Sequence, residues 1–335
     1  MKSFKKLFVV VLSTIILSST LLPAFAIPMS PDKYYIDGST GETFQYELTL
    51  MGNQDTDEAV QLYIFPVGMI KNGVDNDRIF YMPDPNDMSE AANWISLPTS
   101  VVSIPKGEDV KITWTLNIAQ EADCGTNLAG IMTSRFNPED LDSNDIGIKT
   151  NVVSQVHVNV LNRQDSICPE NGVLLSLSDF KVDKKIKLFE YDNIPFYTLV
   201  TNQGNLISRE PQGYIELIGF GEKITIPFND EKLDIYPNTS RAFNDVWLDT
   251  EYPREVKNVG DFFKQVIYQL GHLRIGKYTA RLGITKNAQP QIVSEVSLWI
   301  IPWKLILMLV IIVVVPLTIT NMMHRMREDK SKKKS

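Results

Sequence analysis

Side chains able to carry acid–base or nucleophilic chemistry are scarce in this sequence. Its 335 residues include three histidines, His157, His272 and His324, and neither of the first two has a partner at the spacing of a catalytic or metal motif. His157 alternates with valines, which predicts a solvent-facing side chain, and His272 follows a helical pattern, where a cation suits the helix dipole. Serine-hydrolase, zinc-protease and P-loop patterns do not occur. We expect no enzyme and no cofactor, with carboxylate-only hydrolysis left open because distant acidic pairs leave no spacing signal.

Two acidic stretches carry oxygen ligands at alternate positions, which is the pattern that Ca²⁺ prefers. One covers residues 75–77, and the other places Asp140, Asp142 and Asn144 like the first half of an EF-hand loop. That loop requires a glycine where this sequence has Asp145 and a glutamate where it has Asn151. We expect solvated turn residues here, with a calcium site at Asp140, Asp142 and Asn144 as the alternative.

The sequence has two cysteines, Cys124 and Cys168. Both fall in the part of the chain expected outside the cell, where a disulfide can persist. A bridge would close a loop of about 45 residues and stabilise the fold by about 3 to 4 kcal/mol in the chain-entropy estimate. The alternative is a pair of free thiols without a redox role.

The elements that would position these residues are mostly strands. Short runs alternate apolar and polar residues between turn signals, which predicts antiparallel sheets with one face in a core. We expect an all-β protein of two tandem Ig-like antiparallel β-sandwich domains, residues 27–163 and 174–301, joined by a polar linker at 164–173. Trp94, Trp114 and Trp247 fall in strand patterns and are expected in cores or on sheet faces.

One segment breaks the β pattern. Residues 259–271 place an apolar stripe at helical spacing, with Asp261 as the expected N-cap and Gly271 as the stop. The stripe consists of Phe262, Phe263, Val266, Ile267 and Leu270. We expect it to cover the sheet, with docking on the membrane interface or on a partner as the alternatives.

The two ends of the chain predict its topology. Residues 1–26 have the charged, apolar and Ala-x-Ala parts of a secretory signal peptide, and residues 302–323 are apolar enough to cross a bilayer. The basic tail at 324–335 predicts a cytoplasmic C-terminus, hence a single-pass type I protein of the cell membrane with its domains outside the cytoplasm. The part from Ile27 to Trp303 holds 23 of the 33 Lys and Arg and 38 of the 40 Asp and Glu, so its formal charge is −15. We therefore expect no nucleic-acid partner.

The stretch from Gly68 to Ala92 is too long for a hairpin loop. Long loops on rigid sandwiches often carry binding, so we expect recognition here, with Tyr81, Met82 and Asp84 as the candidate contacts.

The whole layout resembles the bacterial cell-surface proteins that accompany WxL proteins. The resemblance rests on these fragments: Tyr35–Glu42, Trp94–Leu97, Ile104–Glu108, Gly125–Ile131, Asn202–Asn205, Tyr236–Arg241 and Gly276–Ala280. It implies an N-terminal peptidoglycan-binding domain and a second, membrane-proximal domain. The sequence departs from that family around Asn72 and before Ile131, and the helix at 259–271 looks like an insertion.

Together these patterns predict a non-enzymatic, membrane-anchored bacterial surface protein that binds cell-wall polymer or another exported surface protein. The alternative is a membrane-tethered, extracytoplasmic chaperone or assembly factor that accepts a strand from a secreted client at a sheet edge. The sequence leaves the ligand and the oligomeric state open.

Overall fold

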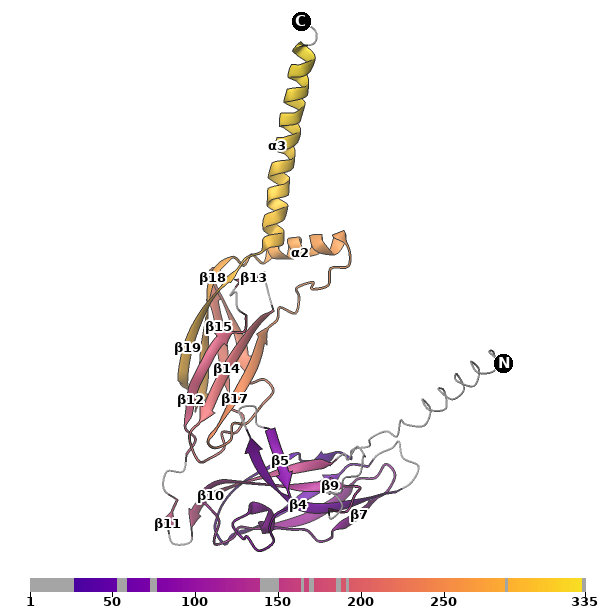
Figure 1. Ribbon diagram of the computed structural model, residues 1–335, viewed down its shortest axis with the longest axis vertical. Coiled ribbons are helices and arrows are strands. Elements are labelled where there is room, and N and C mark those ends of the chain that lie inside the picture. Colours follow the sequence, from indigo (N-terminus) through magenta and orange to yellow (C-terminus); the bar gives the residue numbers. More distant parts are fainter. Residues whose placement is uncertain are drawn as a thin grey trace, which may run out of the picture. The chain divides into compact units, whose positions relative to one another are not determined.

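The computed structural model describes residues 27–52, 59–72, 77–138, 151–163, 166–168, 172–184, 188–190, 193–286 and 289–332. The chain divides into two compact units, with the boundary between Asn171 and Gly172. Each unit is a β-sandwich, and a long helix follows the second one (Figure 1). The predicted all-β fold with a C-terminal apolar helix is therefore confirmed.

Two sheets form the first unit. One has the strand order β1-β3-β8-β6, and the other has the order β11-β10-β9-β4-β5, with β2 added on β10 and β7 added on β4. The bounds are β1 Met29–Ser30, β2 Lys33–Ser39, β3 Thr43–Leu50, β4 Val60–Asn72, β5 Asp77–Tyr81, β6 Ile95–Ser96, β7 Val101–Ile104, β8 Val110–Asn117, β9 Gly125–Ser134, β10 Val152–Arg163 and β11 Ser166–Ile167, with a short 3₁₀ helix η1 at Ala91–Trp94.

The second unit repeats this plan with a three-stranded sheet, β12-β14-β17, and a five-stranded sheet, β13-β19-β18-β15-β16. The bounds are β12 Leu175–Val182, β13 Leu188–Phe189, β14 Ile194–Asn202, β15 Gly213–Gly219, β16 Glu222–Phe228, β17 Thr239–Trp247, β18 Gly276–Lys286 and β19 Gln289–Ile300. A tight turn joins β15 to β16, where Phe220 and Gly221 both have positive φ, as tight two-residue hairpin turns require.

Both units share one unusual strand pair. In the first, β2 runs parallel to β10, and in the second, β13 runs parallel to β19, although the other ladders are antiparallel. The early strands β3 and β14 also hold equivalent positions, each next to the edge-forming strand of the smaller sheet, β8 or β17. The two early strands therefore hold matching positions in the two sandwiches.

Each sandwich has its own apolar core. Trp94 and Trp114 are buried in the first core, and Trp247 is buried in the second, as predicted. Tyr34 packs edge-on against Trp114 with ring centroids 5.0 Å apart. These large rings supply much of the apolar area that stabilises each sandwich.

The prediction that His157 faces solvent is wrong, because its side chain is fully buried. Its strand β10 lies between β2 and β9, and the ring of Tyr35 lies against the imidazole at 5.1 Å between centroids. Gln155 and Asn159, on the same face, are buried as well. The alternation along β10 therefore separates two buried faces, not a buried face from a wet one.

Helix α2 spans Val259–Gly271, which confirms the predicted segment. Its N-cap is Asn258, whose side-chain oxygen accepts a hydrogen bond from the Asp261 backbone N–H at 3.1 Å, so the prediction of Asp261 as the cap is wrong. Asp261 instead accepts a bond from the Lys257 N–H at 3.1 Å. Because Asn258 is the cap, the helix begins at Val259, earlier than a capping aspartate at 261 would place it.

Helix α3 spans Trp303–Lys332, and its part from Trp303 to Met326 is long and apolar enough to cross a membrane. The segment predicted as a basic tail continues this helix as far as Lys332. The predicted signal peptide at 1–26 lies outside the described residues.

Candidate functional site

A groove opens along one side of the first sandwich, between β7 of one sheet and β8 of the other. It has a volume of about 480 Å³ and is lined by residues of β7, of β8 and of the turn before β7. The lining residues are Pro98, Thr99, Val101, Val102, Ser103, Val110, Lys111, Ile112 and Thr113. Val102 and Ile112 are buried, whereas Val101 is 42% exposed, so the groove has an apolar interior and an accessible rim.

The backbone along this groove has unused pairing capacity. Strand β7 pairs with Val60–Tyr63 of β4 on one side, and no strand in the described part of the chain pairs with its other side. Strand β8 pairs with β3 along its length, but β6 covers its second side only at Thr115 and Leu116. The stretch Val110–Thr113 therefore presents an open strand edge across from β7, and such an edge is a template for an added strand.

The second sandwich has a groove on the equivalent side. It lies between β16 and β17, has a volume of about 330 Å³, and is lined by residues of both strands and of the loop that follows β16. Each of these two strands pairs with one neighbour only, β15 or β14, within the described residues. Each sandwich thus has an open groove at the side where its smaller sheet ends.

Asp245 distinguishes the second groove from the first. It lies on β17 between the buried Phe243 and Trp247, so its carboxylate points toward the interior. One oxygen accepts a hydrogen bond from the Asn229 N–H at 3.2 Å, and the other oxygen is buried without a hydrogen-bond partner. Burial, with the nearby Glu231 and Asp230 carboxylates adding to it, raises the pKa of Asp245 from 3.8 to about 6.

The predicted recognition loop at 68–92 is partly strand. β4 continues to Asn72 and β5 returns over Asp77–Tyr81, because the alternating apolar residues extend the hairpin past the point where the sequence reading ended it. Tyr81 lies across the backbone of Gly68, where a Cβ atom would meet the Tyr81 ring at 2.3 Å. Gly68 is thus needed for this close approach.

The remaining two candidates of that stretch have different roles. Met82 is half exposed and available for contact. Asp84 accepts a hydrogen bond from the Asn86 N–H at 2.9 Å, and its carbonyl oxygen accepts one from the Asn93 side chain at 2.7 Å. Asp84 therefore shapes a turn in this segment.

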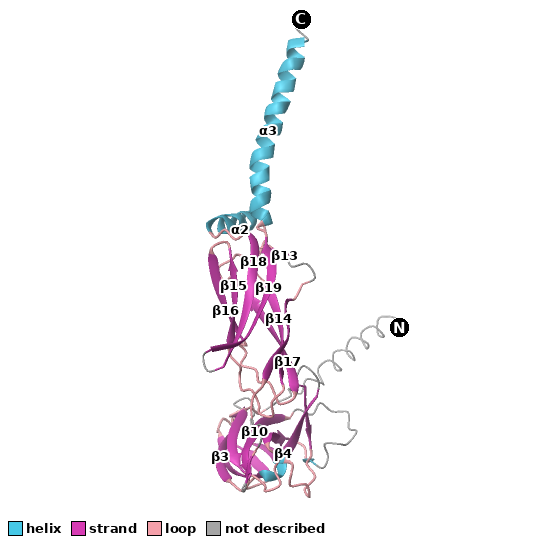
Figure 2. Cartoon of the chain, turned by 90° about the vertical axis from the view of Figure 1, so that its left-hand side faces the viewer, coloured by secondary structure: helices cyan, strands magenta, loops and turns pink. Residues whose placement is uncertain are grey.

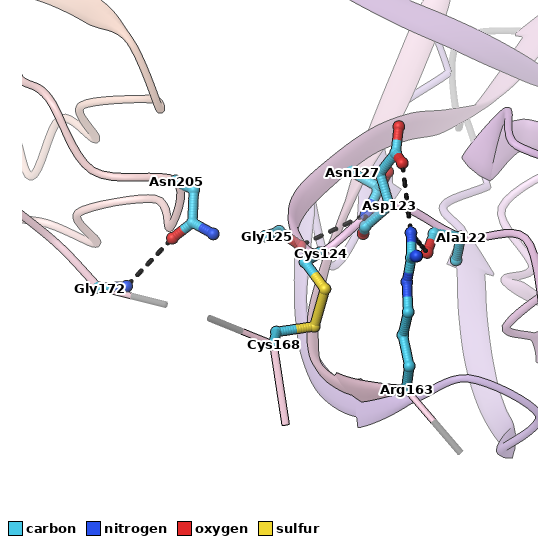
Figure 3. Close-up of a disulfide and its surroundings, with 9 residues drawn as sticks. All are labelled: Ala122, Asp123, Cys124, Gly125, Asn127, Arg163, Cys168, Gly172 and Asn205. Atoms are coloured by element: carbon cyan, nitrogen blue, oxygen red, sulfur yellow. Dashed lines mark hydrogen bonds and ion pairs between the residues drawn. A yellow bond between two sulfur atoms is a disulfide. The ribbon is translucent and has the colours of Figure 1, made fainter. Parts of the chain in front are cut away.

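The structure joins Cys124 and Cys168 in a disulfide, with their Cα atoms 5.7 Å apart (Figure 3). Close by, a guanidinium nitrogen of Arg163 donates to the Ala122 carbonyl at 3.1 Å and lies 3.5 Å from the Asp123 carboxylate. Cys168 is buried in the first core, so part of the segment predicted as a linker belongs to the first unit.

The calcium candidates Asp140, Asp142 and Asn144 lie outside the described residues. Within the described ranges, no three His, Cys, Asp or Glu side chains are grouped closely enough to hold a metal ion.

The helix candidates are divided by the structure. Val266 is buried and Phe262 is partly buried, whereas Phe263, Ile267 and Leu270 are exposed. The expectation that the whole stripe covers the sheet is therefore wrong. Two of the buried positions of α2 are occupied by glutamines, Gln265 and Gln269. Their contacts with α3 were not predicted.

Sequence reasoning also missed both grooves. The strands that line them were recognisable, but a groove depends on which strand edges remain unpaired, and alternation does not reveal that. Asp245 was the one available signal, because an acidic residue between Phe243 and Trp247 breaks the inward apolar pattern of its strand.

The chain matches no known family model and no curated protein. Among solved structures it is similar to a chain of a chaperone–tip adhesin complex from CFA/I fimbriae biogenesis, with 13% identity, a TM-score of 0.36, and coverage of 83% of this chain and 100% of that one. It is similar to the class 5 fimbriae chaperone CfaA, with 10% identity, a TM-score of 0.36, and coverage of 83% and 100%. The E. coli chaperone DraB gives 11% identity, a TM-score of 0.33, and coverage of 82% and 97%.

Proposed function

We propose that this protein is a membrane-anchored, non-enzymatic assembly factor or chaperone that holds exported surface proteins by accepting an extended segment of the client between its sheet edges. The observation that carries this proposal is the groove between β7 and β8, where two strand edges without described strand partners lie on either side of an apolar interior. The function is inferred from this geometry, because the likenesses to solved structures are too slight to assign one.

The groove defines the chemistry of the segment that fits it. A strand added to the edge of β7 or β8 would satisfy open backbone donors and acceptors, and its alternate side chains would enter the space above Val102 and Ile112. Apolar side chains suit these two buried residues, and small polar ones suit the rim at Ser103 and Thr113. The client segment is therefore expected to alternate apolar and polar residues, like a strand missing from an incomplete sandwich.

The negative charge of the protein limits which kinds of partner it can bind. The part of the chain from Ile27 to Trp303 has a formal charge of −15, which repels strongly anionic polymers and favours neutral or cationic segments. Binding to cell-wall polymer stays a prediction of the family resemblance, and a protein client fits the groove better.

The long apolar helix α3 supports the proposal that the protein acts at a membrane surface. Helix α3 is apolar over Trp303–Met326, and the cations after it favour a cytoplasmic C-terminus. With that orientation both sandwiches lie on the side where exported proteins emerge. Type I topology in the cell membrane is part of the proposal.

The test uses a charge placed on the groove rim. Val101 is 42% exposed, so Val101→Asp is expected to fold, while its carboxylate opposes an apolar strand in the groove. The matched control is Ile79→Asp on β5, where the exposed fraction is 49% and which does not line the groove. Each variant replaces the wild-type protein in its native cell, and exported proteins in the envelope are quantified by mass spectrometry beside a deletion strain.

We expect the deletion and Val101→Asp to lower the same small set of exported proteins severalfold, and Ile79→Asp to leave them unchanged. A photo-crosslinking residue at Thr113 should capture members of that set. The proposal fails if deletion leaves the exported proteins intact, or if the purified ectodomain sediments with isolated cell wall and Val101→Asp has no effect in the cell.

A further inference from the structure

Helix α2 has three distinct faces. The first is buried and consists of Gln265, Val266 and Gln269. The second carries the charged side chains of Asp261 and Lys264, which form an ion pair at 2.9 Å. At 100° per residue, Lys264 lies at least 100° from all three buried positions and its side chain is 70% exposed, whereas Asp261 lies close to Gln265 and its side chain is 16% exposed.

The third face is apolar and exposed. It consists of Val259, Phe263, Ile267 and Leu270, which are 72%, 41%, 68% and 64% exposed. Their spacing of three and four residues puts all four within one narrow stripe of the helix. A soluble protein rarely exposes large apolar side chains in a continuous stripe without a partner for it.

The buried face fixes α2 to the start of α3. Gln265 accepts a hydrogen bond from the Lys304 ammonium at 2.6 Å, and Gln269 accepts one from the Leu305 N–H at 3.3 Å. The same two glutamines donate to the sandwich, Gln265 to the Pro253 carbonyl at 2.6 Å and Gln269 to the Tyr252 hydroxyl at 3.0 Å. The helix is thus held in the corner between the second sandwich and the first turn of α3.

This attachment sets the direction of α2. In both views of the chain, α2 lies crosswise to α3 at the end of the sandwich where α3 begins (Figure 2). If α3 crosses a bilayer, α2 runs along the bilayer surface, at the depth of Trp303 and Lys304. Trp is one of the residues enriched at membrane–water interfaces, and Trp303 is 47% exposed.

We propose that α2 is an interfacial helix, and that its stripe of Val259, Phe263, Ile267 and Leu270 is embedded in the outer leaflet of the membrane that α3 spans. Because α2 is attached to the first turn of α3, and that turn enters the bilayer, the surface that covers the stripe is lipid. The exposed Lys264 side chain then remains in water, as the polar face of an interfacial helix requires. This role is independent of the strand-holding function.

The experiment measures where the stripe lies in a bilayer. The described cysteines are both in the disulfide, so a spin label on an introduced cysteine reports one position. Full-length protein is reconstituted in phosphatidylcholine nanodiscs as Ile267→Cys, as Phe263→Cys and as the control Lys264→Cys on the charged face. Collision of the label with oxygen, which enters lipid, is compared with collision with a water-soluble nickel chelate.

We expect labels at Ile267 and Phe263 to favour oxygen severalfold over the chelate, and the label at Lys264 to favour the chelate. Equal access to the chelate at all three positions would overturn the proposal. Shielding of Ile267 from both reagents would overturn it too, because a protein surface would then cover the stripe.

A thermal measurement separates this role from core packing. The double variant Ile267→Ser and Leu270→Ser should keep the wild-type melting temperature of the second sandwich in detergent micelles and in nanodiscs, because both side chains are exposed. It should release α2 from the surface of nanodiscs, seen as faster hydrogen exchange in the helix. Val266→Ser removes a buried side chain and should lower the melting temperature in both media. If the double variant exchanges in nanodiscs like the wild type, the stripe is not in the lipid.

Discussion

Lys304, the second residue of the apolar helix α3, forms an ion pair with Glu190, whose carboxylate oxygen lies 2.7 Å from its ammonium nitrogen. Both side chains are largely shielded from water, with 14% and 31% exposed. The same ammonium donates to Gln265, and Glu190 also accepts from Tyr252 and Gln269. One cation thus joins the apolar helix α3, α2 and the loop after β13 in a single network.

Removal of that cation should loosen the junction. Lys304→Met leaves the Glu190 carboxylate without its cation and the Gln265 carbonyl without its donor in a mostly dry site, which is expected to cost about 2 to 4 kcal/mol. Hydrogen exchange in full-length protein should show faster exchange across α2. The control is Lys257→Met, which removes an ion pair with Glu255 that is exposed on both sides and should change stability by less than about 1 kcal/mol. Equal protection of α2 in both variants would contradict the role of the junction.

Asp245 should make the second sandwich less stable as pH rises. Its pKa in the folded state, about 6, is above the 3.8 of the unfolded chain, so the folded state binds the proton more tightly. The free energy of unfolding attributable to this group should therefore be highest below pH 3.8, fall as pH rises from there to 6, and stay low above 6. Because the carboxyl is partly exposed, the expected difference is only about 1 to 2 kcal/mol.

Asp245→Asn tests this directly. The amide keeps an acceptor for the Asn229 N–H and removes the charge, so the variant should be more stable than the wild type at pH 7 and equal to it near pH 4. Urea unfolding of the second sandwich at both pH values measures the difference. A variant that is less stable at pH 7 would mean that the carboxylate has a cationic partner in the native protein.

The disulfide should stabilise the first sandwich strongly. Cys124 and Cys168 are separated by 44 residues, and the loop-entropy estimate for this length is about 4 kcal/mol. The double variant Cys124→Ala and Cys168→Ala should therefore lower the urea midpoint of the first unit while leaving that of the second unchanged. A loss in both units would show that the bridge acts beyond the first fold.

Substitution of the N-cap of α2 should have a smaller and more local effect on stability. Asn258→Ala removes the acceptor for the Asp261 N–H and is expected to cost about 1 kcal/mol, whereas Asn258→Asp keeps an acceptor and should cost little. Hydrogen exchange at the first turn of α2 checks both. Identical exchange in the alanine and aspartate variants would exclude a capping role for this side chain.

Local sequence patterns predicted most of the strands because alternation and turn residues act within a few positions of each other. The same patterns misplaced His157, since the cover over its face comes from Tyr35 on a distant strand. They also misjudged α2. The hydrophobic pattern predicts that its apolar residues are buried. The junction with α3 needs hydrogen bonds, however, so Gln265 and Gln269 occupy buried positions while Ile267 and Leu270 are exposed. The grooves escaped prediction because they arise from strand edges that pairing leaves open, which is a property of the assembled sheets.

The rigid corner between the second sandwich and α3 has a consequence for binding. A sandwich on a flexible tether would sample a wide volume. It would then lose orientational entropy each time it captured a client segment at the membrane. Here Gln265, Gln269 and Lys304 fix the second sandwich to the start of α3. If α3 spans a membrane, as proposed, the open edges of β16 and β17 are held at one height and one angle above the lipid. A client segment that emerges from the bilayer would then meet these edges at a high effective concentration, with the cost of alignment already met by the fold.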